Sequence, residues 1–560
     1  MYSAVNNILV LAFGTAIAEH LNVLLRSQPK LPPRTPYQQA ICEAAMARQK
    51  HVVTRGVAGC GKTTTIMHVL EDFPGANKRA STSHSYGFNA YRFHVSKHGI
   101  KNVDVDQYKV PTLLAQLLHV DQLNADDQAR ANQKIGPAVK LISYMKNQGF
   151  LAIRSEATDD DLREICMKFD ISLPDPIDGI TEEEIFDLAR QGLTASNNQI
   201  KIIDFDDMIY LPLLLKVNFL WNELILVDES QDLNPTQIAL IKRAANDRAQ
   251  VIFVGDENQA IFGFRGADVE AINSVTEIFD AIKLPLTTCW RCPKAVIRLA
   301  QQIVPEIEAA PDAIEGLVDT IYENDMFAKA EAGDFILCRT TAPLVDACMK
   351  FIRSGKAATV RGRDIGQGLQ ALCDKIKRRR SCKGKNVMDA IFTYRDEMTP
   401  KLSHPRKESQ LQSLTDKLDT LTVLAEECDS IDQLKAKIES IFSEVKDQDD
   451  MKNLIVCSTA HKAKGLEAEN VYIIRPDLMP HPAARQAWQQ KQEMNLKYVA
   501  ITRATRELHF VLEGNSPSSQ DKPESEAKSN TQPEPAKPTK SKRTAKSTTK
   551  KATRKAVKAK

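Results

Sequence analysis

The chain has 560 residues, of which 42% are hydrophobic and 26% are charged. These fractions are typical of a soluble globular protein, so they exclude a chain that is fibrous, or that is disordered or membrane-embedded throughout. The length leaves room for roughly four domains. Eleven cysteines, an odd number at scattered spacings, argue against a disulfide framework and indicate a reducing compartment.

The first apolar stretch, residues 8–18 (ILVLAFGTAIA), resembles a secretion signal in composition. No Lys or Arg precedes it, however, and eleven residues are too few to span a bilayer. The sequence contains no other candidate membrane segment. The chain is therefore predicted to be intracellular.

Residues 56–63 read GVAGCGKT and match the phosphate-loop pattern G-x-x-x-x-G-K-[ST] at every fixed position. Residues 51–55 predict a strand and residues 63–70 a helix, the context in which backbone N–H groups and a helix N-terminus bind phosphates. Lys62 is expected to reach the β- and γ-phosphates, and the Thr63 hydroxyl to bind Mg²⁺. The residues predicted to bind the nucleotide here are Gly56, Val57, Ala58, Gly59, Cys60, Gly61, Lys62, Thr63 and Thr64.

An acidic pair follows a predicted strand at residues 223–227, within WNELILVDESQD. The carboxyl ends of parallel strands share one edge of a sheet, so Asp228 and Glu229 are expected beside the phosphate loop. Asp228 would hold Mg²⁺ through its water shell, and Glu229 would polarise the attacking water. Paired acids at a strand end can also form a solvated turn, but the complete phosphate loop upstream favours the catalytic interpretation.

Short apolar runs separated by helical patterns favour an α/β protein with two parallel sheets, one before residue 285 and one after. These runs are residues 51–55, 224–227, 251–254, 335–339, 453–457, 471–474 and 508–512. Two segments, residues 86–200 and 371–450, are predicted to be helical insertions without a chemical motif. Cys289 and Cys292 could form half of a zinc site, but no second pair lies nearby, so a structural metal is not predicted.

From residue 514 the composition becomes rich in Ser, Pro, Lys, Thr and Ala, which predicts a disordered tail. Its last part, residues 537–560, carries eleven Lys or Arg and no acid. Such a segment is expected to bind nucleic acid phosphates, and the alternative is a solubilising tail without a specific role.

Four further motifs follow the phosphate loop and the acidic pair. Residues 251–268 read VIFVGDENQAIFGFRGAD, and LTTCWRCP, CSTAHKAKGLEAENV and EMNLKYVAITRA follow near residues 290, 460 and 500. Ahead of them all, residues 35–41 read TPYQQAI. In this order the motifs resemble those of UvrD/Rep-type superfamily 1 DNA helicases, and they extend from about residue 35 to about residue 512.

The resemblance implies an α/β fold with two RecA-like parallel-sheet lobes of the P-loop NTPase type, helical insertions and a disordered basic tail. ATP and Mg²⁺ would bind between the lobes. The implied division is residues 1–85 and 201–285 for the first lobe, 86–200 for its insertion, 286–370 and 451–513 for the second lobe, 371–450 for a smaller insertion and 514–560 for the tail.

Carried over position by position, the resemblance implies that Gln38 reads adenine and that Trp290 stacks on it. The family usually has Tyr at that position, and Trp offers the same aromatic face. Besides Lys62 and Glu229, the implied catalytic and nucleotide roles are γ-phosphate sensing by Gln259, a ribose contact by Glu467 and arginine-finger action by Arg291 and Arg503.

The implied partner is single-stranded DNA, including its junctions with duplex, and the implied direction of travel is 3′→5′. Phe262 and Phe264 occupy positions where the family stacks aromatic side chains on bases, a contact that tolerates any sequence. Thr82, His84 and His461 match further positions that contact the strand or couple it to hydrolysis.

One element is out of order relative to the family, which places a strand of the type LAFNxAIAxEL between the phosphate-loop helix and the T-x-H motif. Here that interval is too short, and residues 8–21 (ILVLAFGTAIAEHL) resemble the missing element. We hypothesise that this strand enters the sheet beside the phosphate-loop strand, because strand pairing depends on edges and register rather than chain order. Phe13 would then stack on a base, although Gly14 stands where the family usually has Asn. The competing explanation is a rearranged sequence or gene.

The leading prediction is an ATP-dependent DNA helicase or translocase in repair, recombination or replication. One alternative is a translocase that strips proteins from DNA with little strand separation, since the second insertion is small. Another is a non-catalytic DNA-binding protein with a decayed motor, against which the complete catalytic set argues. The expected location is the cytoplasm of a bacterial or phage-infected cell, or the nucleus of a eukaryotic one.

Overall fold

The computed structural model describes residues 7–12, 14–169, 171, 173, 180–246, 249–261, 271–403, 408–443, 452–482, 484 and 486–514. All of these lie in one compact unit, Met1–Asn515. The predicted base-stacking residues Phe13, Phe262 and Phe264, and the tail after residue 514, lie outside the described residues. Among the described helices, none combines the length and the apolar character needed to cross a bilayer.

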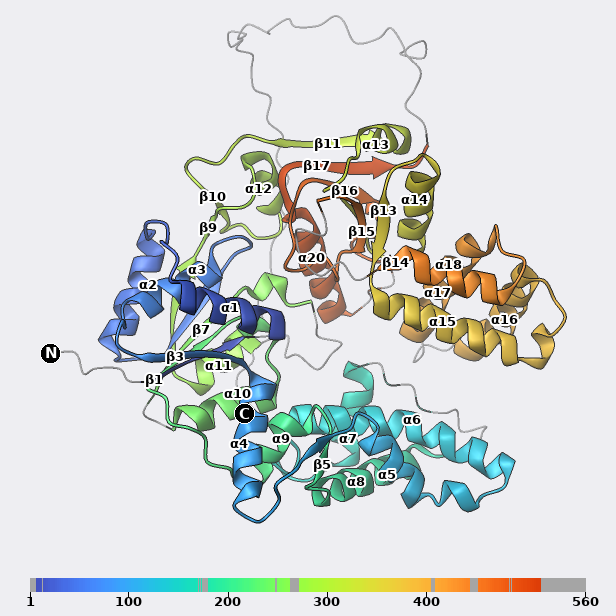
Figure 1. Ribbon diagram of the computed structural model, residues 1–560, viewed down its shortest axis with the longest axis horizontal. Coiled ribbons are helices and arrows are strands. Elements are labelled where there is room, and N and C mark those ends of the chain that lie inside the picture. Colours follow the sequence, from blue (N-terminus) through green and yellow to red (C-terminus); the bar gives the residue numbers. More distant parts are fainter. Residues whose placement is uncertain are drawn as a thin grey trace, which may run out of the picture. The chain divides into compact units, whose positions relative to one another are not determined.

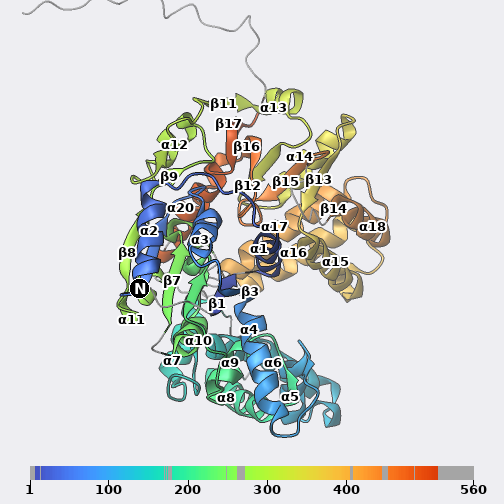
Figure 2. The same cartoon turned by 60° about the vertical axis from the view of Figure 1, so that its left-hand side comes forward.

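The first sheet has six parallel strands in the order β3-β1-β6-β7-β2-β8 (Figures 1 and 2). Its strands are β1 (Asn7–Ala12), β2 (Val52–Gly56), β3 (Asn77–Thr82), β6 (Leu224–Val227), β7 (Gln250–Gly255) and β8 (Ile282–Leu286). The central strands β6 and β7 are buried along their whole length, which explains their unbroken apolar sequence. The helices of this part are α1 (Thr15–Ser27), α2 (Pro36–Ala47), α3 (Lys62–Glu71), α10 (Pro235–Ala245) and α11 (Ala271–Ile278).

The N-terminal strand β1 is part of this sheet, as the sequence predicted. It pairs in parallel on both sides, with Val10 opposite Ala80 of β3 and opposite Leu226 of β6. The expected place beside the phosphate-loop strand is wrong, because β7 and β8 occupy the two edges of β2. Val10 is completely buried, so a segment that begins before the phosphate loop supplies a central strand of the core.

The predicted first insertion is mainly helical (Figure 1). It comprises α4 (Ser83–Ser96), β4 (Asp104–Val105), α5 (Lys109–Leu117), η1 (Val120–Gln122), α6 (Ala125–Gln148), α7 (Asp159–Lys168), α8 (Glu182–Asn198), β5 (Ile202–Ile203) and α9 (Asp207–Leu214). Charged side chains lie in its core. The buried carboxylate of Asp207 forms ion pairs with two lysines, Lys109 Nζ at 2.6 Å and Lys146 Nζ at 2.7 Å.

The second sheet has seven parallel strands in the order β11-β17-β16-β12-β15-β13-β14, which confirms the prediction of two parallel sheets. Its strands are β11 (Leu317–Tyr322), β12 (Phe335–Cys338), β13 (Ala358–Arg361), β14 (Phe442–Ser443), β15 (Ile455–Thr459), β16 (Ala468–Ile474) and β17 (Ala504–Leu512). A short pair, β9 (Thr288–Cys289) and β10 (Glu308–Ala309), precedes it. The accompanying helices are α12 (Lys294–Ala300), α13 (Glu323–Lys329), α14 (Ala342–Arg353) and α20 (Ala487–Ile501).

Where the structure describes them, residues 371–450 are mostly helical and include the short strand β14. The helices of this second insertion are α15 (Arg363–Arg378), α16 (Val387–Leu402), α17 (Glu408–Ala425) and α18 (Ile431–Ile441). They share a hydrophobic core with one face of the second sheet, through Leu344 and Phe351 of α14 and Leu421 of α17. Helix α14 thus joins the insertion to the sheet.

Candidate active site

The phosphate loop connects the end of β2 to the start of α3, as the sequence predicted. Gly59 and Gly61 have positive φ angles of 64° and 78°, which glycine adopts without the steric cost that other residues meet. Gly61 is the N-cap of α3, and no described side chain caps the helix. The first N–H groups of α3 and the positive end of its dipole therefore remain directed at a phosphate position.

Lys62, the first residue of α3, lies beside the carboxylate of Glu229, with 3.9 Å between Nζ and Oε1. Burial by itself lowers the pKa of this lysine. The negative charges of Glu229, Asp256 and Asp228 outweigh burial and raise the pKa above its ordinary value. Lys62 is therefore positively charged at neutral pH, beside the loop that is predicted to bind phosphates.

Asp228 and Glu229 follow β6 directly, as predicted, and differ in their electrostatics. Burial, together with the charge of Glu229, raises the pKa of Asp228 to about 7. Burial also opposes ionisation of Glu229, but Lys62 and Lys464 overcome it and lower the pKa of Glu229 to about 2. Glu229 has a left-handed backbone (φ 50°, ψ 43°), an unusual conformation for a residue with a side chain. An ionised, rigidly held carboxylate at this place suits a base that orients water.

Asp256 extends this acidic group from the neighbouring strand β7. Its backbone N–H donates to Gln231 Oε1 at 2.9 Å, and Gln231 Nε2 donates to Glu229. Gln259 Nε2 donates to Asp256 Oδ2 at 2.7 Å. The predicted γ-phosphate sensor and the predicted base are thus joined by a chain of hydrogen bonds. Sequence reasoning missed Asp256, although its place after a strand is the same signal that identified Asp228.

Lys464, from the loop between β15 and β16, was also missed by sequence reasoning, although it belongs to the quoted STAHKAKG motif. Its Nζ lies 2.6 Å from Asp232 Oδ2 and 3.9 Å from Glu229 Oε2, and donates to the Gln259 carbonyl at 2.9 Å. Burial raises the pKa of Asp232 to about 6 despite this lysine. A single cation of the second lobe therefore contacts three parts of the first-lobe site.

Arg291 and Trp290 lie against the phosphate loop. Trp290 donates its backbone N–H to the Gly59 carbonyl at 2.9 Å, and a Cβ atom on Gly59 would be 2.6 Å from Arg291 Cβ. The Trp290 ring is half exposed, which leaves it open to a planar ligand. Arg291, the predicted arginine finger, forms an ion pair with Glu467, the predicted ribose contact.

Arg503 is buried and held within the second lobe. Nε donates to the Val499 carbonyl at 2.8 Å and Nη1 to the Leu466 carbonyl at 2.9 Å. Burial, followed by repulsion from Arg291, lowers the pKa of Arg503 to about 10. The guanidinium thus carries a charge at neutral pH, as an arginine finger requires.

Gln38 lies in the first turn of α2 and contacts the first turn of α3. It completes a capping box with Thr35 at the N-terminus of α2, and its Nε2 donates to Thr65 Oγ1 at 3.2 Å. A Cβ on Gly61 would be 3.5 Å from the same Nε2. The predicted adenine-reading residue is therefore next to the phosphate loop, although adenine reading itself stays a prediction.

The predicted strand-contacting residues are partly described. Thr82 is the N-cap of α4, and its hydroxyl accepts the N–H of Ser85 at 3.0 Å. Burial lowers the pKa of His84, which lines a small cavity together with Asp228. His461 is half buried after β15. The roles of these residues in DNA binding stay predictions.

The donor set at the phosphate loop fits Mg²⁺, which prefers carboxylate and hydroxyl oxygens and completes its shell with water and phosphate. Asp228 and Thr63 supply such oxygens at the ends of β6 and the start of α3. Within the described residues, no three His, Cys, Asp or Glu side chains are grouped so that they could hold a metal ion. The Cys292 thiol donates to the Thr502 carbonyl, with 3.6 Å between Sγ and the oxygen.

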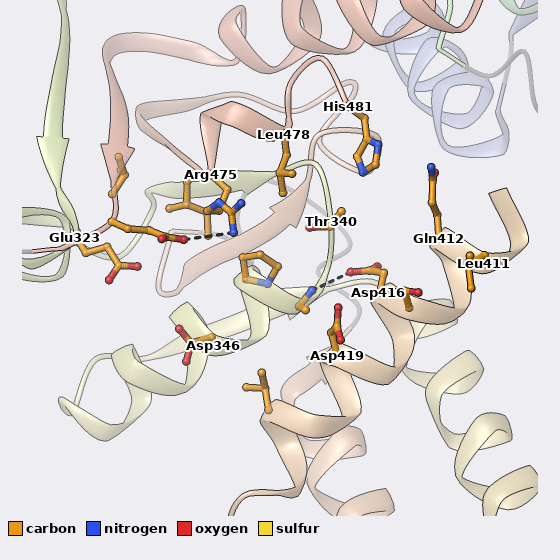
Figure 3. A pocket seen from close by; sticks show the side chains of 17 residues that line it. Glu323, Thr340, Asp346, Leu411, Gln412, Asp416, Asp419, Arg475, Leu478 and His481 are labelled. Carbon is orange, nitrogen blue, oxygen red and sulfur yellow. Dashed lines mark hydrogen bonds and ion pairs between the residues drawn. The ribbon is translucent and has the colours of Figure 1, made fainter. Parts of the chain in front are cut away.

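A cavity of about 690 Å³ lies elsewhere, at the carboxyl ends of β12, β16 and β17 (Figure 3). Its lining includes the acidic residues Glu323, Asp346, Asp416, Asp419 and Glu513. Asp416 Oδ1 accepts the N–H groups of Thr341 and Ala342 at the start of α14, at 2.9 and 3.2 Å. A carboxylate of the protein thus fills the position where this helix would bind a phosphate, so the cavity does not suit a second nucleotide.

Two domain families match the chain: the UvrD/REP helicase N-terminal domain over residues 74–280 and the UvrD-like helicase C-terminal domain over residues 454–511. The ATP-dependent DNA helicase Rep of Buchnera aphidicola is 35% identical over 133 residues, which are 22% of this chain and 21% of Rep. Rep of Escherichia coli is 34% identical over 112 residues (18% and 17%). The ATP-dependent DNA helicase srs2 of Schizosaccharomyces pombe is 31% identical over 133 residues (23% and 14%). The chain therefore covers no more than 21% of the length of these three relatives.

Proposed function

We propose that this chain, which matches the UvrD/REP helicase N-terminal domain and the UvrD-like helicase C-terminal domain, is an ATP-driven motor that travels 3′→5′ on single-stranded DNA and separates duplex at junctions. The observation that carries the proposal is the meeting of charges from both lobes at one phosphate loop. Lys62 and Lys464 each lie 3.9 Å from the carboxylate of Glu229. A protein that had lost its motor activity would not be expected to retain these two largely buried ion pairs with Glu229.

In the proposed reaction, Glu229 accepts a hydrogen bond from the attacking water and takes its proton as the water oxygen bonds to the γ-phosphorus. The bond from that phosphorus to the bridging oxygen breaks at the same time, and ADP leaves with the electron pair. The low pKa keeps Glu229 ionised at neutral pH, and Gln231 fixes its orientation. Mg²⁺ held by Thr63 and Asp228 would neutralise phosphate charge. Lys62, Arg291 and Arg503 would stabilise the negative charge that develops on the transferred phosphoryl group.

The coupling of hydrolysis to movement is proposed to depend on the contacts between the lobes. Lys464 pairs with Asp232 and holds the Gln259 carbonyl, so a change at the γ-phosphate position reaches the second lobe directly. Alternate closing and opening of the lobes around the nucleotide would then move the strand. The residues proposed to hold the strand are Phe13, Thr82, His84, Phe262, Phe264 and His461, and the basic tail is proposed to bind phosphates nearby.

A duplex with a 3′ single-stranded tail, one with a 5′ tail and a blunt duplex test the proposal. With ATP, we expect separation of the 3′-tailed duplex only, and none for Lys62→Met, which lacks the phosphate-binding charge. Separation of the 5′-tailed duplex would contradict the direction.

The second candidate, a translocase with little strand separation, is favoured by the small insertion at residues 371–450. It predicts ATP-dependent removal of streptavidin from a biotinylated single strand without separation of any duplex. If neither streptavidin removal nor strand separation occurs while ATP is hydrolysed, the motor proposal fails.

A further inference from the structure

Helix α20 (Ala487–Ile501) carries a row of three polar side chains, at spacings of three residues, that hydrogen-bond the first lobe. Residues three apart lie on neighbouring positions of one helix face. Gln492 Nε2 donates to the Ile261 carbonyl at 2.8 Å. Asn495 Nδ2 donates to the carbonyls of Glu257 and Ala260 at 3.3 and 3.1 Å.

The third member of the row contacts the phosphate loop itself. The hydroxyl oxygen of Tyr498 accepts the backbone N–H of Ala58 at 2.9 Å. Tyr498 and Ala58 are completely buried, and Asn495 is nearly so. A buried backbone N–H without a partner costs free energy, so this hydrogen bond holds the phosphate loop in one position relative to α20.

The segment to which Gln492 and Asn495 donate contains a residue proposed to sense ATP and precedes, in the sequence, a residue proposed to bind DNA. Residues 257–261 include η4 (Glu257–Gln259) and thus the proposed γ-phosphate sensor, and they lead in sequence to the proposed base-stacking Phe262. Lys464 donates to a further carbonyl in this stretch, that of Gln259. Four carbonyls of five consecutive residues therefore accept hydrogen bonds from the second lobe.

We infer that Gln492, Asn495 and Tyr498 are positioning residues that transmit strand binding to ATP hydrolysis, with α20 as the rigid connection between residues 257–261 and the phosphate loop. This inference rests on the proposed function. Every hydrogen bond of the row that joins the two lobes goes to a backbone group, so the three side chains act on the site through the main chain. A displacement of residues 257–261 by a bound strand moves the donors on α20, and the Tyr498 hydroxyl moves Ala58 with them.

The test compares Gln492→Ala, Asn495→Ala and Tyr498→Phe with Gln490→Ala, which alters an exposed position of the same helix. ATP turnover is measured without DNA and with saturating oligo(dT), and the dissociation constant of a labelled oligo(dT) is measured by fluorescence anisotropy. We expect the ratio of the two turnover rates to fall about fivefold for each row variant, as the loss of one or two hydrogen bonds implies. The oligo(dT) dissociation constant should stay within about twofold of the unchanged protein, and Gln490→Ala should keep the full ratio.

A purely structural role predicts a different pattern, in which turnover with and without DNA falls in the same proportion and the ratio is preserved. That result, or a row variant with a normal ratio, would overturn the inference. Thermal melting identifies any variant that does not fold, and Gln492→Ala, at a half-buried position, keeps the test open if the buried variants fail. Absence of stimulation in the unchanged protein would instead refute the proposed function itself.

Discussion

Lys464 and Asp232 form an ion pair whose substitution should change protein stability and ATP hydrolysis in different ways. The side chain of Asp232 is fully buried, and Lys464 Nζ is 2.6 Å from its Oδ2. Its other oxygen, Oδ1, accepts no hydrogen bond from a described residue. Lys464→Met would therefore leave a buried carboxylate without its counter-charge.

Loss of one partner of a buried ion pair costs about 3 to 5 kcal/mol, mostly because the remaining charge is stranded. The cost should depend on pH, since burial already raises the pKa of Asp232 to about 6 in the unchanged protein. At pH 8 Asp232 is ionised and we expect a loss of about 3 kcal/mol. At pH 5 Asp232 is protonated in both proteins, and the loss should shrink to about 1 kcal/mol, the worth of a neutral hydrogen bond.

Urea unfolding followed by circular dichroism at both pH values measures these losses. The double variant Lys464→Met/Asp232→Asn removes the stranded charge and should recover most of the stability at pH 8. It should not recover DNA-stimulated ATP hydrolysis, because Lys464, one of the two lysines beside Glu229, is still missing. A double variant no more stable than Lys464→Met, or a loss that is equal at both pH values, would refute this reasoning.

Gly59→Ala should weaken binding of a fluorescent ATP analogue at least about tenfold, because the new Cβ at positive φ would lie 2.6 Å from Arg291 Cβ; Gly75→Ala, where nothing lies within 4 Å, is the control, and equal affinities would contradict the packing. The Mg²⁺ concentration for half-maximal ATP hydrolysis should be higher at pH 6 than at pH 8, because Asp228, with a pKa of about 7, must lose its proton to support the metal; an unchanged requirement would exclude Asp228 from that role. Deletion of residues 1–30 should abolish cooperative unfolding and DNA-stimulated ATP hydrolysis, because it removes the central strand β1; a folded, active product would show that the strand is dispensable.

The phosphate loop and the pair Asp228–Glu229 could be predicted from sequence because both depend on short patterns. Each pattern predicts its own local structure, a strand followed by a turn. Parallel strands then bring their carboxyl ends to one edge of the sheet. The rule says nothing about which strands are neighbours. For that reason β1 was expected beside β2, whereas it lies between β3 and β6.

The contacts between distant segments could not be predicted in the same way. Lys464 is 232 positions from Asp232, and Tyr498 is 440 positions from Ala58. Nothing in the local sequence of either residue indicates its partner. The charged core of the first insertion is a similar case. From the sequence alone, Lys146 and Asp207 are expected at the surface, whereas the fold buries them as an ion pair.

The most direct test of the account is ATP hydrolysis with and without single-stranded DNA, in the intact chain and in Glu229→Gln. The substitution keeps the shape of the side chain and removes its charge. We expect strong stimulation by DNA in the intact chain and a loss of about 100-fold or more in Glu229→Gln, with ATP binding retained. Equal turnover in the two proteins, or no stimulation of the intact chain, would contradict the account.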